Sequence, residues 1–128
     1  MNSFARPLLV SKEIAFHFEY EKKVQHLHLE MTKRKNFYLT FKESLNNALK
    51  YSDCKNFWVN INIQQHHLML CVKDDGKGFD TKKAKSAATL SGNGMQNMKL
   101  RAKEMKGICT VESEPGKGTI VMLKFPIP

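Results

Sequence analysis

Strict alternation of apolar and polar residues is the feature that most constrains how this chain folds. The segment 13–20 alternates without interruption, and the segment 57–64 does the same before the pattern resumes at 68–72. A period of two predicts β-strands with one buried face each. The interruption at His66 and His67 predicts a hairpin between the second and third strands. The apolar residues expected on the buried faces of the first two strands are Ile14, Phe16, Phe18, Tyr20, Phe57, Val59, Ile61 and Ile63.

Two other segments repeat their apolar residues every three to four positions, which is typical of helices with one buried face. The first covers about 33–51, and the hydroxyl of Thr32 is expected to cap it. The second covers about 95–106 and is expected to stop at Gly107. The residues expected to face the core are Phe37, Phe41, Leu45, Ala48 and Leu49 in the first helix, and Met95, Met98, Ala102 and Met105 in the second.

The order of the elements predicts the fold class. Two last strands are expected at about 108–113 and 119–125. The segment 76–94 has no sustained period and is expected to form a long mobile loop, either a functional lid or a disordered segment. Strand, long helix, hairpin, loop, helix and hairpin in that order predict an α+β fold. We expect a two-layer α/β sandwich with a mixed, mostly antiparallel sheet and helices on one face. Residues 1–12 lack a clear pattern, so we expect a loose lead-in from an upstream segment, followed by one domain over 13–128.

Composition narrows the class of protein. The 128 residues are 41% hydrophobic and 26% charged, as in ordinary soluble domains, and no apolar run approaches the roughly 20 residues that cross a bilayer. The net charge of +9 favours a polyanionic partner, but the basic residues are spread along the chain, which favours a small polyanion over nucleic acid. Three widely spaced cysteines predict reduced core thiols in a cytoplasmic protein.

Polar residues gather on one stripe of the first predicted helix. Glu43, Asn47 and Lys50 fall at positions i, i+4 and i+7, so they point the same way. One interpretation is a solvated polar face. The other is a Mg²⁺ site, in which the amide oxygen of Asn47 is a ligand and the carboxylate one turn earlier orients a bound water.

Three glycine-containing segments each allow two interpretations. The segment 74–78 (Asp-Asp-Gly-Lys-Gly) is either a common turn or a site where glycines admit a flat ligand and Asp74 accepts a hydrogen bond from the exocyclic amine of adenine. The segment 92–94 (Gly-Asn-Gly) is either a plain helix entry or a phosphate site at a helix N-terminus. The segment 116–119 (Gly-Lys-Gly-Thr) alone predicts only a hairpin turn. None of the three completes a Rossmann or P-loop motif.

In this order, the four segments resemble the N, G1, G2 and Gly-x-Gly-Thr boxes of the ATPase superfamily shared by DNA gyrase, mismatch-repair ATPases and sensor histidine kinases. The resemblance covers roughly residues 13–126. The stretch 92–102 is similar to response-regulator kinases typified by nitrate sensors. The resemblance implies the Bergerat ATP-binding fold, bound ATP and Mg²⁺, and the cytoplasmic catalytic domain of a membrane-anchored sensor histidine kinase.

The resemblance also implies a role for each matched residue. Asn47 would ligate Mg²⁺, Lys50 would approach a phosphate, and Asp74 would bind the adenine amine with support from Thr119 through a water molecule. Glu43 is the candidate base, a role more natural in an ATPase relative, because in the kinase subfamily the base comes from another domain. The nucleotide-contacting residues implied in this way are Asn46, Asn47, Lys50, Asp74, Gly76, Gly78, Phe79, Gly92, Asn93, Gly94, Met95 and Thr119.

The sequence also departs from the family pattern. Such kinases carry the phosphorylated histidine on a separate dimerising helical hairpin, and none of the histidines here lies in a matching motif. We therefore expect a monomeric domain that hands the γ-phosphate of ATP to that hairpin in the parent kinase, with a response regulator downstream. Asp75 stands where many members have Asn. Two alternatives stay open: an anti-sigma-type serine kinase of the same fold, and a basic nucleic-acid-binding module.

Overall fold

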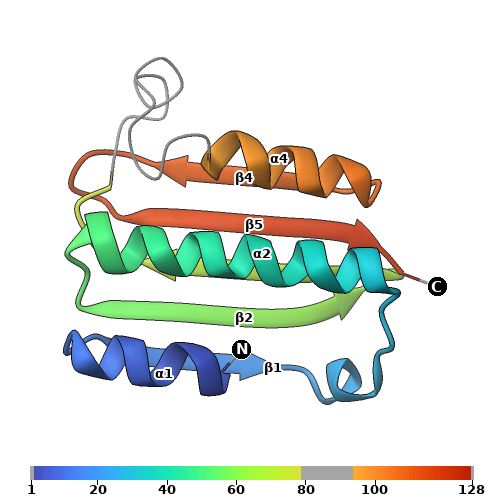
Figure 1. Ribbon diagram of the computed structural model, residues 1–128, viewed down its shortest axis with the longest axis horizontal. Coiled ribbons are helices and arrows are strands. Elements are labelled where there is room, and N and C mark those ends of the chain that lie inside the picture. Colours follow the sequence, from blue (N-terminus) through green and yellow to red (C-terminus); the bar gives the residue numbers. More distant parts are fainter. Residues whose placement is uncertain (1, 79–93, 128) are drawn as a thin grey trace.

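The computed structural model describes residues 2–78 and 94–127, which form a mixed β-sheet covered on one face by helices (Figure 1). The strands of this described part are β1 (Ala15–Tyr20), β2 (Asn56–Gln64), β3 (His67–Asp74), β4 (Ile108–Ser113) and β5 (Thr119–Pro126), and its α-helices are α1 (Asn2–Ser11), α2 (Met31–Asn47) and α4 (Gly94–Glu104). The strand order is β1-β2-β3-β5-β4. β1 and β2 are parallel, and the other neighbouring pairs are antiparallel. The predicted α+β, two-layer architecture is confirmed.

The two hairpins turn through left-handed backbone. Gln65 and His66 join β2 to β3 with φ angles of 50° and 61°, a geometry that matches the twist of the flanking strands. His67 already belongs to β3, so the predicted interruption of the pattern lies one residue earlier than expected. Between β4 and β5 the left-handed positions are Gly116 and Gly118, with φ angles of 82° and 77°.

Alternation along the strands separates the side chains of the sheet into two sets. One set meets the helices and forms the core, together with the apolar faces of α1, α2 and α4. On the other face, Asn60, Cys71 and Met122 are cross-strand neighbours, and Met122 is 38% exposed. Cys71 is therefore a half-buried thiol of that face rather than the core thiol we expected. The largest fully buried side chains include Phe41, Leu45, Phe57, Leu70, Met98, Met105, Leu123 and Phe125.

The first predicted strand is shorter than expected. Alternation predicts a strand over 13–20, but β1 begins at Ala15 because Glu13 adopts a left-handed φ of 58°. Tyr20, predicted to face the core, is 45% exposed at the end of this edge strand, and its hydroxyl accepts a hydrogen bond from Gln25. The helical turn Lys22–His26 and α2 then carry the chain across to β2, the long crossover that a parallel pair requires.

Helix α1 is the main difference from the sequence prediction. We expected a loose lead-in over 1–12, whereas residues 2–11 are helical and lie beside β1 (Figure 1). Ala5 and Leu9, one turn apart, are both fully buried in the core. The guanidinium carbon of Arg6 lies 5.0 Å from the ring centroid of Phe16. Two buried side chains are too short a pattern to predict a helix, but they suffice to dock one. The division into a lead-in and a domain over 13–128 stays a prediction.

Helix α2 differs from the prediction at both ends. It begins at Met31 with Glu30 in the N-cap position, so Thr32 is inside the helix and does not cap it. At the other end the α-helix stops at Asn47 and continues as a π-helical turn over Ala48–Ser52, which Asp53 ends in the left-handed conformation. Apolar spacing cannot distinguish these two helix types over a single turn. The wider π turn means that the predicted stripe holds only up to Asn47.

Helix α4 ends in a Schellman motif. Lys106 adopts a φ of 61°, the N–H of Gly107 donates to the carbonyl of Ala102, and the N–H of Lys106 donates to that of Lys103. The left-handed residue is thus Lys106, although we expected Gly107 to serve as the stop. Gly107 is needed for a different reason, because a Cβ at this position would collide with the backbone of β5.

Candidate functional site

The end of β3 meets the start of β5. Asp74 is the last residue of β3 and pairs with Thr119, the first residue of β5. One residue beyond the strand end, Gly118 lies so close that a Cβ there would collide with the backbone carbonyl of Asp74. A Cβ on Gly78 would likewise collide with the carbonyl of Glu114. The fold therefore brings the predicted G1 and Gly-x-Gly-Thr segments together, and their glycines allow the contact.

Asp74 is a buried carboxyl group. Its side chain is 7% exposed, and its Oδ1 accepts a hydrogen bond of 2.9 Å from the N–H of Gly76. Burial raises the pKa of Asp74 above its usual value, against the opposing effect of the Gly76 hydrogen bond. A buried acceptor at the end of a strand can select a ligand that offers a donor.

Thr119 is oriented by a residue that the sequence did not single out. Its hydroxyl oxygen lies 2.9 Å from Oγ of Ser113, across the β4–β5 pair. Ser113 donates its own proton to the carbonyl of Gly118 at 2.9 Å, so Thr119 is the donor of the shared contact. Toward any other group, the Thr119 hydroxyl can then act only as an acceptor. No periodicity or motif marks Ser113, so its role could not be predicted from the sequence.

The C-terminal end of α2 lies near the N-terminal end of α4 because the two helices run antiparallel. Asn36 donates to Glu104 at 3.2 Å, and further along α2 the hydroxyl of Ser44 contacts the sulfur of Met98 at 3.8 Å. One more turn places the start of α4 beside the end of α2. In Figure 1 these two helix ends and the end of β3 lie at the same end of the molecule.

The predicted residues of α2 have different environments. Glu43, Asn46 and Asn47 are half-buried, whereas Lys50, in the π turn, is exposed. The Oδ1 atom of Asn47 is buried and accepts no hydrogen bond within the part of the chain that the structure describes. An orphaned buried oxygen is costly without a partner, so it marks a position where a donor or a cation fits.

The predicted G2 segment is described only in part. Gly94 begins α4, and Met95 is half-buried and packs against the core. Phe79, Gly92 and Asn93 lie outside the described residues.

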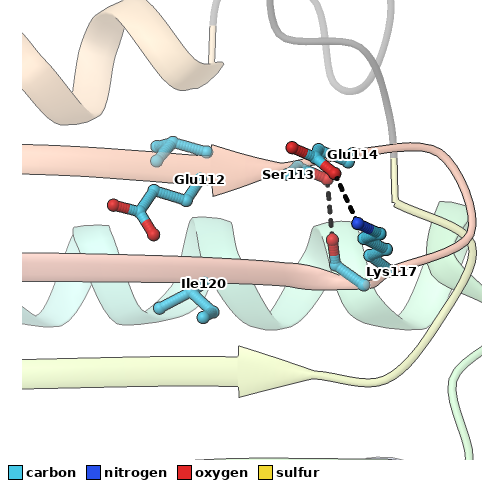
Figure 2. Close-up of a pocket in the computed structure, with 7 residues that line it drawn as sticks. Glu112, Ser113, Glu114, Lys117 and Ile120 are labelled. Atoms are coloured by element: carbon cyan, nitrogen blue, oxygen red, sulfur yellow. Dashed lines mark hydrogen bonds and ion pairs between the residues drawn. The ribbon is translucent and has the colours of Figure 1, made fainter.

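A separate cavity of about 530 Å³ lies at the β4–β5 end of the sheet. Figure 2 shows Glu112 and Ile120 on these strands, and they are cross-strand partners of the face opposite the helices. Glu114 and Lys117 form an exposed ion pair of 3.1 Å at its rim. Ser113 and Gly118 also line this cavity, whereas Asp74 and Thr119 do not, so the cavity adjoins the site of Asp74 and Thr119 but is not that site.

Comparison with known proteins gives several relatives from Bacillus subtilis (strain 168). The signal transduction histidine-protein kinase/phosphatase DegS is 39% identical over 85 residues, and the sensor histidine kinase LiaS is 38% identical over 85 residues. The sensor histidine kinase YdfH is 31% identical over 103 residues. These alignments cover 66%, 66% and 80% of this chain but 22%, 22% and 25% of the relatives. The chain thus spans a quarter or less of the length of these kinases.

Two solved structures with the same fold come from histidine kinases. The histidine kinase domain of the blue-light activated kinase of Erythrobacter litoralis EL346 matches with a TM-score of 0.74 and 18% identity, over 98% of this chain and 58% of that one. The kinase AdeS of Acinetobacter baumannii matches with a TM-score of 0.73 and 14% identity, over 98% and 60%. At these identities the likeness shows the fold.

The sequence model of one protein family matches most of the chain. The model described as histidine kinase-, DNA gyrase B-, and HSP90-like ATPase matches residues 32–128, which include the end of α2, the end of β3, α4 and the β4–β5 hairpin. The finer likeness to nitrate sensors stays a prediction. The chain belongs to the histidine kinase-, DNA gyrase B- and HSP90-like ATPase family.

Proposed function

We propose that this chain is the ATP-binding catalytic domain of a sensor histidine kinase and presents the γ-phosphate of ATP to a histidine on a separate dimerisation domain. The observation that carries the proposal is the buried carboxyl of Asp74, paired with Thr119 at the strand end. The end of β3, whose last residue is Asp74, lies at the end of the molecule where α2 and α4 also meet (Figure 1). An acceptor of this kind can bind the exocyclic amine of adenine.

Asp74 is proposed to bind the exocyclic amine of adenine. An ionised carboxylate only accepts hydrogen bonds, so it attracts this amine and repels the carbonyl that guanine has at the same position. Gly76 and Gly78, which follow it, line the adenine pocket in this proposal. Thr119, on the neighbouring strand, supports the carboxylate through a water molecule that donates to both groups. Phe79, outside the described residues, is proposed to complete this side of the pocket.

Asn47 is proposed to ligate Mg²⁺. Its buried Oδ1 has no hydrogen-bond donor among the described residues, and a neutral amide oxygen beside several waters suits this cation. When bound, Mg²⁺ would neutralise charge on the ATP phosphates. Asn46, adjacent on α2, and Lys50, exposed on the π turn, are proposed to lie along the phosphates.

The start of α4 is proposed to hold the phosphates. Backbone N–H groups at a helix N-terminus are unpaired and attract anions. Gly94 and Met95 begin this helix, and Gly92 and Asn93 precede it in the sequence. Phosphoryl transfer depends mainly on positioning and charge neutralisation, which these groups would supply.

Partners and setting are proposed from the relatives. The acceptor histidine belongs to the dimerisation domain of the parent kinase, and a response regulator acts downstream. Glu43, one turn before Asn47, is proposed as the residue that orients a water or accepts a proton. We place the domain on the cytoplasmic side of a membrane-anchored sensor, and as a monomer when isolated. Within the described residues, no helix combines the length and apolar character that spanning a bilayer demands.

Thermal unfolding with Mg-ATP and with Mg-GTP tests the nucleotide site. A ligand that binds only the folded state raises the melting temperature. At 100 times its Kd, such a ligand adds roughly 2.7 kcal/mol to the free energy of unfolding. We expect a rise of several degrees with ATP, little with GTP, and none with ATP for Asp74→Asn. Glu112→Gln removes the same charge from an exposed position and should behave as wild type. Equal shifts with both nucleotides would contradict the role of Asp74.

Phosphotransfer in trans tests the activity. The chain, mixed with labelled ATP and a purified dimerisation domain of a related sensor kinase, should label that domain on histidine. Glu43→Gln should lower the rate without weakening ATP binding if Glu43 acts on the reacting groups. Labelling of a serine on an antagonist protein instead would favour the anti-sigma-type kinase. Tight, salt-sensitive DNA binding that ignores Mg-ATP would favour the nucleic-acid module.

A further inference from the structure

The carboxylate of Asp75 is bound by the segment that leads into β2. Its Oδ1 accepts hydrogen bonds from the backbone N–H groups of Lys55 and Asn56, both at 2.9 Å, and its Oδ2 accepts one from Nδ2 of Asn56, also at 2.9 Å. Slight burial acts to raise the pKa of Asp75, but these hydrogen bonds outweigh it, and the pKa lies below its usual value. Asp75 is therefore a charged acceptor that three donors hold in one orientation.

Asn56 extends this contact to β1. Because its Nδ2 donates to Asp75, its Oδ1 is the atom that lies 3.0 Å from Nε2 of His17. An amide oxygen only accepts, so Nε2 of His17 carries the proton in this contact. The N–H of Ala15 also donates to the carbonyl of Lys55 at 2.9 Å. The start of β2 is thus held between Asp75 and β1.

The turn after Asp74 has an anchor on each side. On the β5 side, the N–H of Gly116 donates to the carbonyl of Lys77. On the β2 side are the three hydrogen bonds of Asp75 and an ion pair of 3.0 Å between Lys77 and Asp53, whose side chains are 67% and 78% exposed. Exposed ion pairs contribute little, so Asp75 is the stronger anchor on the β2 side.

We infer that Asp75 is a positioning residue of the nucleotide site, which fixes the turn that orients the carboxyl of Asp74. The inference rests on the proposed function, because it concerns the group assigned there to adenine. Oδ1 of Asp74 is bound to the N–H of Gly76, so a movement of the backbone between them reorients the carboxyl. Both oxygens of Asp75 are bound to Lys55 and Asn56 at the start of β2, so Asp75 acts through the backbone rather than on the nucleotide.

Asp75→Ala and Asp75→Asn test this role by two measurements. Amide hydrogen exchange without nucleotide reports on the turn, and the ratio of the ATP and GTP dissociation constants reports on the orientation of Asp74. For Asp75→Ala, the Gly76 amide should exchange at least about tenfold faster, and the preference for ATP should fall by about tenfold. Asp75→Asn keeps an oxygen for the backbone donors and should give smaller changes in both. If Asp75→Ala does not fold, the same two measurements on Asp75→Asn decide whether Asp75 positions Asp74.

Asp53→Asn is the matched control. It removes the same charge and the ion pair that joins the same two segments, and asparagine tolerates the left-handed φ of 52° at this position. Because the pair is exposed, both the exchange of the Gly76 amide and the preference for ATP should stay at wild-type values.

Two results would overturn the inference. Wild-type exchange of the Gly76 amide in the Asp75 variants would mean that Asp75 does not anchor the turn. Faster exchange with an unchanged preference for ATP would mean that the anchor stabilises the fold but does not position Asp74. Failure of the proposed function looks different, because wild type itself would then show no preference for ATP, while the exchange measurement still decides whether Asp75 anchors the turn.

Discussion

Asp74 and Asp75 are neighbours with opposite electrostatic environments. Burial raises the pKa of Asp74, so the folded state favours its protonated form. Despite slight burial, hydrogen bonds from Asn56 and Lys55 lower the pKa of Asp75, so the folded state favours its charged form. At neutral pH the charged carboxyl of Asp74 therefore destabilises the folded state, whereas that of Asp75 stabilises it. Their effects on stability must therefore change with pH in opposite ways.

Asp74→Asn should show this dependence in urea unfolding without nucleotide. Because the folded pKa of Asp74 is raised, its favourable contribution is complete below the unfolded pKa of about 3.9 and is lost as pH rises through the folded pKa. The free energy of unfolding of wild type minus that of Asp74→Asn should decrease over this window. For Asp75→Asn the same difference should instead shrink as pH falls below about 3.9. An Asp74 difference that grows with pH would contradict the burial argument.

Gly118 is the glycine on which the site most depends. A Cβ there would meet the carbonyl of Asp74, and the φ of 77° is unfavourable for any other residue. Gly118→Ala should destabilise the domain by about 2–4 kcal/mol and abolish ATP binding. Gly116→Ala is the control, because its φ of 82° is similar but nothing lies within 4 Å of the added atom. It should lose only about 1 kcal/mol, and equal losses in chemical denaturation would argue against the contact.

At the scale of elements, α1 shows how few residues are needed to attach a helix. Leu9 is fully buried, whereas its neighbour Leu8 is 39% exposed. Leu9→Ala should lower the free energy of unfolding by about 2–5 kcal/mol through lost burial and a cavity. Leu8→Ala should cost about 1 kcal/mol, since more than a third of that residue is already exposed to water. Similar losses for the two variants in urea unfolding would mean that α1 does not dock on the sheet in solution.

At the scale of the whole molecule, a sheet with helices on one face should tolerate substitution very unevenly. Leu123 and Met122 are adjacent in β5, but Leu123 is 1% exposed in the core and Met122 is 38% exposed on the other face. Leu123→Ala should cost about 2–5 kcal/mol, and Met122→Ala about 1 kcal/mol or less. Equal costs in urea unfolding would indicate that another surface covers the face that carries Met122.

Periodic patterns predicted most of the architecture from sequence. The core positions Phe37, Phe41, Met98 and Met105 all follow from helical spacing, because a helix must bury its apolar stripe. Alternation predicted the β2–β3 hairpin for the same reason, whereas the glycine-containing segment 116–119 predicted the turn of the β4–β5 hairpin. The four boxes in order indicated that Asp74 and Thr119 would belong to one site, and the strand pairing brings them together.

What the sequence by itself determined is which residues face inward and in what order the elements follow, since these depend on local spacing. What only the tertiary structure decided depends on neighbours distant in the chain. Helix α1 forms over a short apolar pattern because β1 receives it. Asp75 becomes an anchor only when Asn56 stands beside it, and Ser113 orients Thr119 only across a strand pair. A hydrogen bond between distant residues leaves no period in the sequence, so the fold must form before such contacts can be seen.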